Sequence, residues 1–129
     1  MGTRSLTYMY EDNMPLVCMY RQFDGYLSGH GSELAEFLSD IKMVNGIGVN
    51  APSNIANGAG CLAAQLVSHF KTDPGGIYIV PADTDRMGID YVYQVHVNGD
   101  SINVKVEGYE GKFSGTVEQF AMYCESEDE

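Results

Sequence analysis

The stretch that most constrains the fold is an Asn-Gly pair between two alternating runs, VYQVHV and SINVKV, in residues 92–106. Alternating apolar and polar side chains predict strands with one buried face. An Asn-Gly pair between such runs is a strong hairpin signal, because both residues tolerate positive φ. We expect Val95 and Val97 to share a face with Tyr91 and Tyr93. The chain therefore contains antiparallel sheet, and His96 alternates with Gln94 on the polar side of its strand.

Other segments predict further strands and helices. Residues 3–10 and 15–23 are rich in β-branched and aromatic residues, and the polar EDN between them suggests a hairpin; GGIYIVP predicts another short strand. Residues 33–43 and 61–71 carry apolar residues at helical spacing, and Thr116 to Gln119 fits a capping box that opens a short last helix. The sequence predicts an α+β fold of about five mainly antiparallel strands, with two main helices on one face and a short C-terminal helix.

Length and composition indicate one domain. The chain has 129 residues, of which 44% are hydrophobic, enough apolar material for a single core. We expect a globular domain over residues 1–124 and a flexible acidic tail, ESEDE, over residues 125–129. Residues 44–60 contain four glycines and four asparagines, and we expect them to form an ordered functional loop.

The charge balance limits the partners. With 18 acidic and seven basic residues, the formal net charge is −11, which disfavours nucleic acid because backbone binding needs clustered Lys and Arg. The chain has no apolar run of the ~20 residues that a membrane span needs, and its first residues, MGTRSLTYMY, lack the apolar stretch of a signal peptide, so we expect no membrane partner and a cytoplasmic location. The three cysteines form no closely spaced pair, and we expect neither a metal site nor a cofactor.

Two arginines face each other in the predicted first hairpin. A symmetric loop over residues 11–14 pairs residues whose numbers sum to 25, so Arg4 lies opposite Arg21. Like charges across a ladder are destabilising unless something negative lies between them. That charge comes either from Asp24, which follows shortly after, or from a bound carboxylate or phosphate gripped by the two guanidinium groups.

The turn FDGYLSGHGS, residues 23–32, holds a second candidate site. Gly29 and Gly31 bracket His30 and permit the close approach of another group. His30 immediately precedes a helix start, where unpaired backbone N–H groups favour anions. It is either a neutral capping residue or part of an anion site.

Cys61 is a third candidate, because the glycine-bearing NGAG leads into its helix. A helix N-terminus can lower a thiol pKa, and Cys61, His30 and Asp24 could act as nucleophile, base and orienting group. The small apolar neighbours suit a buried structural cysteine equally well.

Several motifs carry a resemblance to a known group of proteins. The segments MGTRSLT, MYRQFDGYLSGHGSELAEFL, NGAGCLAAQLVSHFK and FSGTVEQF resemble a family of small uncharacterised bacterial and phage proteins, over nearly the whole chain. The resemblance brings no activity and no catalytic residues. It implies a small intracellular protein, often phage-borne, for which host interaction or evasion of host defence is expected.

These observations favour non-catalytic binding of a small anionic ligand such as a nucleotide, for example by a phage-borne protein that sequesters a host signal. The alternatives are a cysteine- or histidine-dependent hydrolase or transferase, and an acidic protein-interaction or inhibitor module. Nine tyrosines also suit a homo-oligomer interface. The expected ligand site, with an Asn-rich cover that includes Asn50, consists of Arg4, Tyr20, Arg21, Phe23, Asp24, Tyr26, His30, Asn54 and Asn57.

Overall fold

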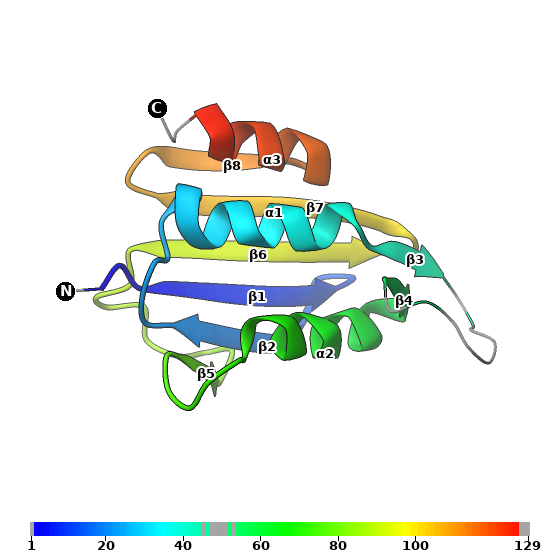
Figure 1. The fold of residues 1–129 in the computed structure, drawn as a ribbon, viewed down its shortest axis with the longest axis horizontal. Coiled ribbons are helices and arrows are strands. Elements are labelled where there is room, and N and C mark those ends of the chain that lie inside the picture. The colour runs from blue at the N-terminus through cyan, green and yellow to red at the C-terminus, as the bar shows by residue number, and fades with distance from the viewer. Residues whose placement is uncertain (1, 45, 47–51, 53, 127–129) are drawn as a thin grey trace.

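The computed structural model describes residues 2–44, 46, 52 and 54–126, and these residues form eight strands and three α-helices (Figure 1). The strands are β1 (Ser5–Glu11), β2 (Met14–Arg21), β3 (Lys42–Val44), β4 (Ile55–Asn57), β5 (Ile77–Val80), β6 (Tyr91–Asn98), β7 (Ser101–Gly108) and β8 (Gly111–Thr116). The helices are α1 (Ser32–Ser39), α2 (Gly58–Phe70) and α3 (Val117–Ser126), and a π-helical turn, Leu27–Gly31, leads into α1.

Six of the strands form one sheet in the order β5-β2-β1-β6-β7-β8. Its central pair, β1 and β6, is parallel, and the other neighbours in this sheet are antiparallel. β3 and β4 form a separate parallel pair. The α+β class is confirmed, but the expected strand number was too low. β8, GKFSGT, was not predicted, because two glycines and a single large apolar residue do not give the alternating pattern typical of a strand.

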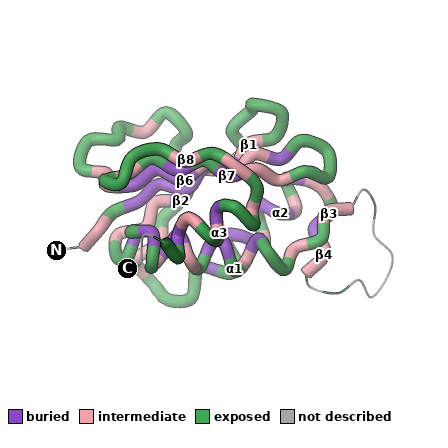
Figure 2. Tube along the Cα trace, turned by 90° about the horizontal axis from the view of Figure 1, so that it is seen from above, coloured by how far each residue is buried: buried purple, intermediate pink, exposed green. Residues whose placement is uncertain are grey.

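The three helices lie on one face of the six-stranded sheet, as predicted, so the molecule has two layers (Figure 2). α2 covers β1 and β2, while α3 packs on β7 and β8 and contacts α1. The alternation predicted for the central hairpin is confirmed, since Tyr91, Tyr93, Val95 and Val97 all belong to the core beneath the helices. The Asn98–Ser101 pair closes this hairpin.

The opposite face of the sheet is covered over only part of its area. There a second cluster contains Leu6, Tyr8, Cys18 and Val92, beside Ile89 of the 81–90 segment. Among the described residues, no helix covers this face. We call it the open face; on β6, β7 and β8 it carries the polar side chains that alternate with the core residues.

The register of the first hairpin corrects the expected arginine pair. Next to the turn the pairing follows the prediction, with Glu11 opposite Met14. A bulge at Met9/Tyr10 then shifts the register by one residue, so that Ser5, and not Arg4, lies opposite Arg21. Side chains of neighbouring residues point to opposite faces, so the two arginines do not share a site.

Three predicted boundaries also change. The first helix ends at Ser39, since Lys42–Val44 forms β3 and Asn54 Nδ2 donates to the Asp40 carbonyl. The expected loop of residues 44–60 contributes β4 and the first turn of α2, and residues 45, 47–51 and 53 lie outside the described residues. Residues 125 and 126 of the expected acidic tail belong to α3, whereas 127–129 are not described.

The capping box is confirmed. The Gln119 backbone N–H donates to Thr116 Oγ1 at 3.1 Å, and the Thr116 N–H donates to Gln119 Oε1 at 2.9 Å. These reciprocal bonds satisfy donors at the start of α3 and explain how a strand turns directly into a helix.

Candidate functional site

The residues expected to form one ligand pocket lie in separate parts of the structure. Arg4 is at the sheet end, where its N–H donates to Asp90 Oδ2. Tyr20 lies next to Tyr78, with ring centroids 6.1 Å apart, and alternates with Arg21 along β2, so the two point to opposite faces. Arg21 and Phe23 do line a common pocket.

Arg21 has a protein acid as its partner. Its Nη1 donates to Glu33 Oε1 at 2.7 Å, and the same nitrogen lies 3.1 Å from His30 Nδ1. The acid is therefore Glu33 of α1 and not Asp24, which was the acidic partner expected from the sequence. Asp24 instead has a positive φ of 62° and lies 3.4 Å from the hydroxyl of Tyr26, which donates to it.

His30 is fully buried between the turn and the sheet. Because arginine can only donate, His30 Nδ1 must accept the bond from Arg21. The ring proton is therefore on Nε2, which donates to Thr7 Oγ1 at 2.7 Å. Burial, and secondarily the Arg21 charge, lowers the pKa of His30 to about 3. This neutral ring ties the turn to β1 and β2, and it has no surface that a ligand could touch.

The Arg21 pocket has a volume of about 270 Å³. It lies between β2, α1 and the segment before β5, and its walls include Arg21, Phe23, Glu33, Gly75 and Gly76. The Arg21 charge is compensated by Glu33, and Asp73 also lines the pocket. An anion would therefore meet little net positive charge here.

The predicted asparagine cover lies elsewhere. Asn54 donates to the Asp40 carbonyl, and Asn57 Oδ1 accepts the Gly46 N–H at 2.7 Å. Both side chains therefore order the backbone around β3 and β4. Asn50 lies outside the described residues.

The cysteine-histidine arrangement of the alternative hypothesis is not formed. Cys61 Sγ lies 3.6 Å from Gln65 Oε1 in the first turns of α2, whereas His30 contacts Phe70 at the end of that helix. Nine residues of helix separate these ends by about 13 Å. Among the described residues, no group of three His, Cys, Asp or Glu side chains could hold a metal ion. No described helix is long and apolar enough to cross a membrane.

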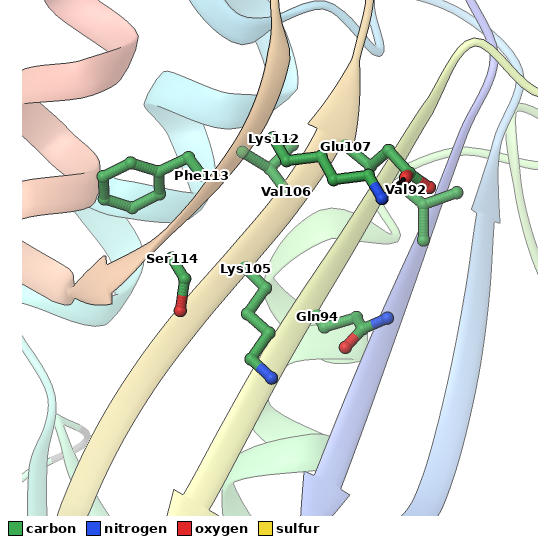
Figure 3. A pocket seen from close by; sticks show the side chains of 8 residues that line it. All are labelled: Val92, Gln94, Lys105, Val106, Glu107, Lys112, Phe113 and Ser114. Carbon is green, nitrogen blue, oxygen red and sulfur yellow. Dashed lines mark ion pairs between the residues drawn. The ribbon is translucent and has the colours of Figure 1, made fainter.

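A larger concavity of about 390 Å³ lies on the open face over β6, β7 and β8 (Figure 3). Five polar side chains line it: Gln94 from β6, Lys105 and Glu107 from β7, and Lys112 and Ser114 from β8. They are neighbours because Gln94 pairs with Lys105 and Lys105 pairs with Ser114 across the ladder. Figure 3 shows Phe113 turned away from them, in accord with its packing on Phe120.

The charged side chains of this concavity are two lysines and one glutamate. Lys105 makes no ion pair within the described residues, and Lys112 Nζ lies 3.1 Å from Glu107 Oε2 with both side chains more than half exposed. Arg86 lies on the same face, stacked over Tyr8 with its guanidinium carbon 5.0 Å from the ring centroid. Three of the chain's seven basic residues are thus on the open face.

These residues were not predicted as a site from the sequence. Gln94, Lys105 and Ser114 stand at alternate positions of three different strands, and only the ladder registers bring them together. Their polar alternation predicted an exposed strand face, and β8 itself was not predicted. One sequence feature could have indicated this site: Lys105 and Lys112 lie close together in a chain that is otherwise acidic.

Comparison of the chain with protein-family models, with curated proteins and with solved structures found no match.

Proposed function

We propose that this protein binds a small anionic ligand, without chemical conversion, in the concavity over β6, β7 and β8. The observation that carries the proposal is the convergence of Lys105, Lys112, Gln94 and Ser114 on a part of the sheet that no described helix covers. Ammonium, amide and hydroxyl groups are all hydrogen-bond donors, and together they match the oxygens of a phosphate or carboxylate.

The existing ion pair is compatible with such a ligand. The Lys112–Glu107 pair is exposed on both sides, and exposed pairs of this kind contribute little stability. Lys112 can therefore turn toward an anion at a small cost in free energy. Lys105 makes no ion pair within the described residues, so it has none to break. The net charge of −11 slows the approach of an anion from a distance but does not cancel this local pair of cations.

Titration with ribose 5-phosphate, followed by calorimetry, tests the proposal. We expect saturable binding that Lys105→Ala weakens about tenfold or more, since hydrogen bonds to charged groups are worth about 1.5–3 kcal/mol. Lys42→Ala is the matched control, because it removes an exposed lysine from β3, outside the six-stranded sheet.

Three results would contradict the proposal. The first is that Lys105→Ala and Lys42→Ala weaken ribose 5-phosphate binding equally, because the loss would then come from the change in net charge and not from a contact with Lys105. The second is absence of binding to the unaltered protein. Loss of binding in Arg21→Ala with full retention in Lys105→Ala would place the anion in the Arg21 pocket and also refute it.

A further inference from the structure

We infer that the anion is carried by a molecule with a planar aromatic ring, of the nucleoside monophosphate class, and that this ring stacks on His96. The inference rests on the proposed function, because the phosphate end is assigned to the lysine concavity. The ring end is assigned by a separate feature of the open face, the stacked pair formed by Tyr10 and His96.

The Tyr10 and His96 rings are parallel to within 3°, with centroids 4.6 Å apart. The two residues are partners in the β1–β6 ladder, and their ring separation is close to the spacing of adjacent strands, about 4.8 Å. Both rings therefore stand upright on the sheet, each facing a neighbouring strand. Since β6 lies between β1 and β7, the second face of His96 is directed toward β7.

Within the described residues, His96 stacks on Tyr10 through its first face, and no other ring contacts it, so no ring covers the second face. Its neighbour in the same row of β7 is Asn103, which pairs with His96 in the ladder. Asn103 makes no side-chain hydrogen bond within the described part of the chain. A purine placed above it would extend the row of stacked rings by one member, and a free amide can read the edge of such a base.

His96 is joined to the lysine concavity by a hydrogen bond. Its Nε2 lies 2.9 Å from Oε1 of Gln94, which lines the concavity. Burial, and secondarily Lys105, lowers the pKa of His96, so the ring is neutral at pH 7 and stacks as an uncharged aromatic. Gln94 thereby fixes the ring while its own amide borders the anion site.

The spacing along β7 suits a base linked to a phosphate through a sugar. Asn103 and Lys105 are two residues apart on the same face, which is about 7 Å along a strand. A ribose bridges that interval, with the base beside Asn103 and the phosphate beside Lys105. The concavity of about 390 Å³ receives the phosphate and the ribose, and the base lies beside it, because His96 and Asn103 are not among its walls.

The charge at the site sets the class of ligand. Two ammonium groups, with Glu107 next to one of them, match one phosphate better than a chain of phosphates. An extended nucleic acid would meet the repulsion of an acidic molecule beyond these lysines. A mononucleotide presents one ring and one phosphate, which is what this face can hold.

Adenosine 5′-monophosphate (AMP) and ribose 5-phosphate, titrated in parallel, test the inference. We expect AMP to bind about tenfold more tightly, which corresponds to one base stacked on an aromatic ring. We also expect the adenine proton resonances to move upfield in NMR spectra, because the ring of His96 shields a stacked base. His96→Ala should bring AMP down to the affinity of ribose 5-phosphate, and His96→Phe should keep the difference.

The outcomes separate the inference from the proposed function. Equal affinities for AMP and ribose 5-phosphate, with unshifted adenine resonances, would overturn the stacking site and leave the anion site standing. If neither compound binds, the proposed function falls as well. If AMP retains its advantage in a folded His96→Ala protein, the base lies elsewhere and the inference is wrong. The shifts of the unaltered protein test stacking even if that variant fails to fold.

Discussion

His30 shows how a residue type that suggests a reactive site can serve the fold. Its Nδ1 accepts from Arg21, its Nε2 donates to Thr7, and its ring packs against Phe70 and Tyr93. Arg21 in turn donates to Glu33, so one line of bonds joins β1, the turn, β2 and α1. Protonation of His30 would place two cations 3.1 Å apart, and the network would break.

This arrangement predicts a specific pH dependence of stability. The pKa of His30 is about 3 in the folded protein and close to 6.5 in the unfolded chain, so below pH 6.5 the unfolded state binds a proton that the folded state does not. Stability should therefore fall as the pH is lowered from about 6.5 toward 3, by up to about 1.4 kcal/mol per pH unit from this group. Urea unfolding at pH 7 and pH 5 measures the change.

His30→Gln provides the comparison for that measurement. It removes the titrating group, so the loss of unfolding free energy between pH 7 and pH 5 should shrink even though the variant is less stable overall. His96, whose pKa is also lowered, remains in both proteins and contributes equally to each. An unchanged pH dependence in His30→Gln would refute the role assigned to His30.

Among the structural elements, the π-helical turn leaves no room for a side chain at Gly31 of the GHG sequence. A Cβ added to Gly31 would lie 2.9 Å from Cys124 Sγ and 3.2 Å from the Tyr93 hydroxyl. The close approach predicted from Gly31 is thus made to the core, by a side chain of α3 and one of β6, and no ligand is needed to explain it.

Gly31→Ala should consequently destabilise the protein by about 1–3 kcal/mol, the usual cost of overpacking a core. Gly60→Ala is the matched control, because it lies in α2, has a free Cβ position and should gain up to about 1 kcal/mol from helix propensity. Thermal unfolding of both variants measures the contrast. Equal stability of the two variants would show that Gly31 is not packed as described.

Local sequence patterns predicted the elements better than their boundaries. The helical spacing in residues 61–71, the Asn-Gly hairpin and the Thr116 capping box all depend on neighbours within a few residues, and the structure contains each of them. The bulge at Met9/Tyr10 could not be predicted, because one extra residue in a strand leaves no mark on an alternating pattern. The expected Arg4–Arg21 site was wrong for that reason.

For the whole molecule, the parallel pairing of β1 with β6 determines where a site can be. It joins strands some eighty residues apart and places β6, β7 and β8 on one side of the first hairpin. No local pattern predicts such a pairing, and so the sequence could indicate polar strand faces but not that Gln94, Lys105 and Ser114 meet. The anion-binding hypothesis came from composition and turn motifs; its proposed location depends on the topology.

The most direct test of the account is to map which backbone amides change their chemical shift when a ligand binds in solution. Backbone amide NMR spectra recorded during a titration with AMP should show saturable shifts confined to residues 92–96, 103–107 and 112–114, with the rest of the sheet unchanged. Shifts concentrated at Arg21, Phe23, Gly75 and Gly76 would contradict the account, as would spectra that do not change at all.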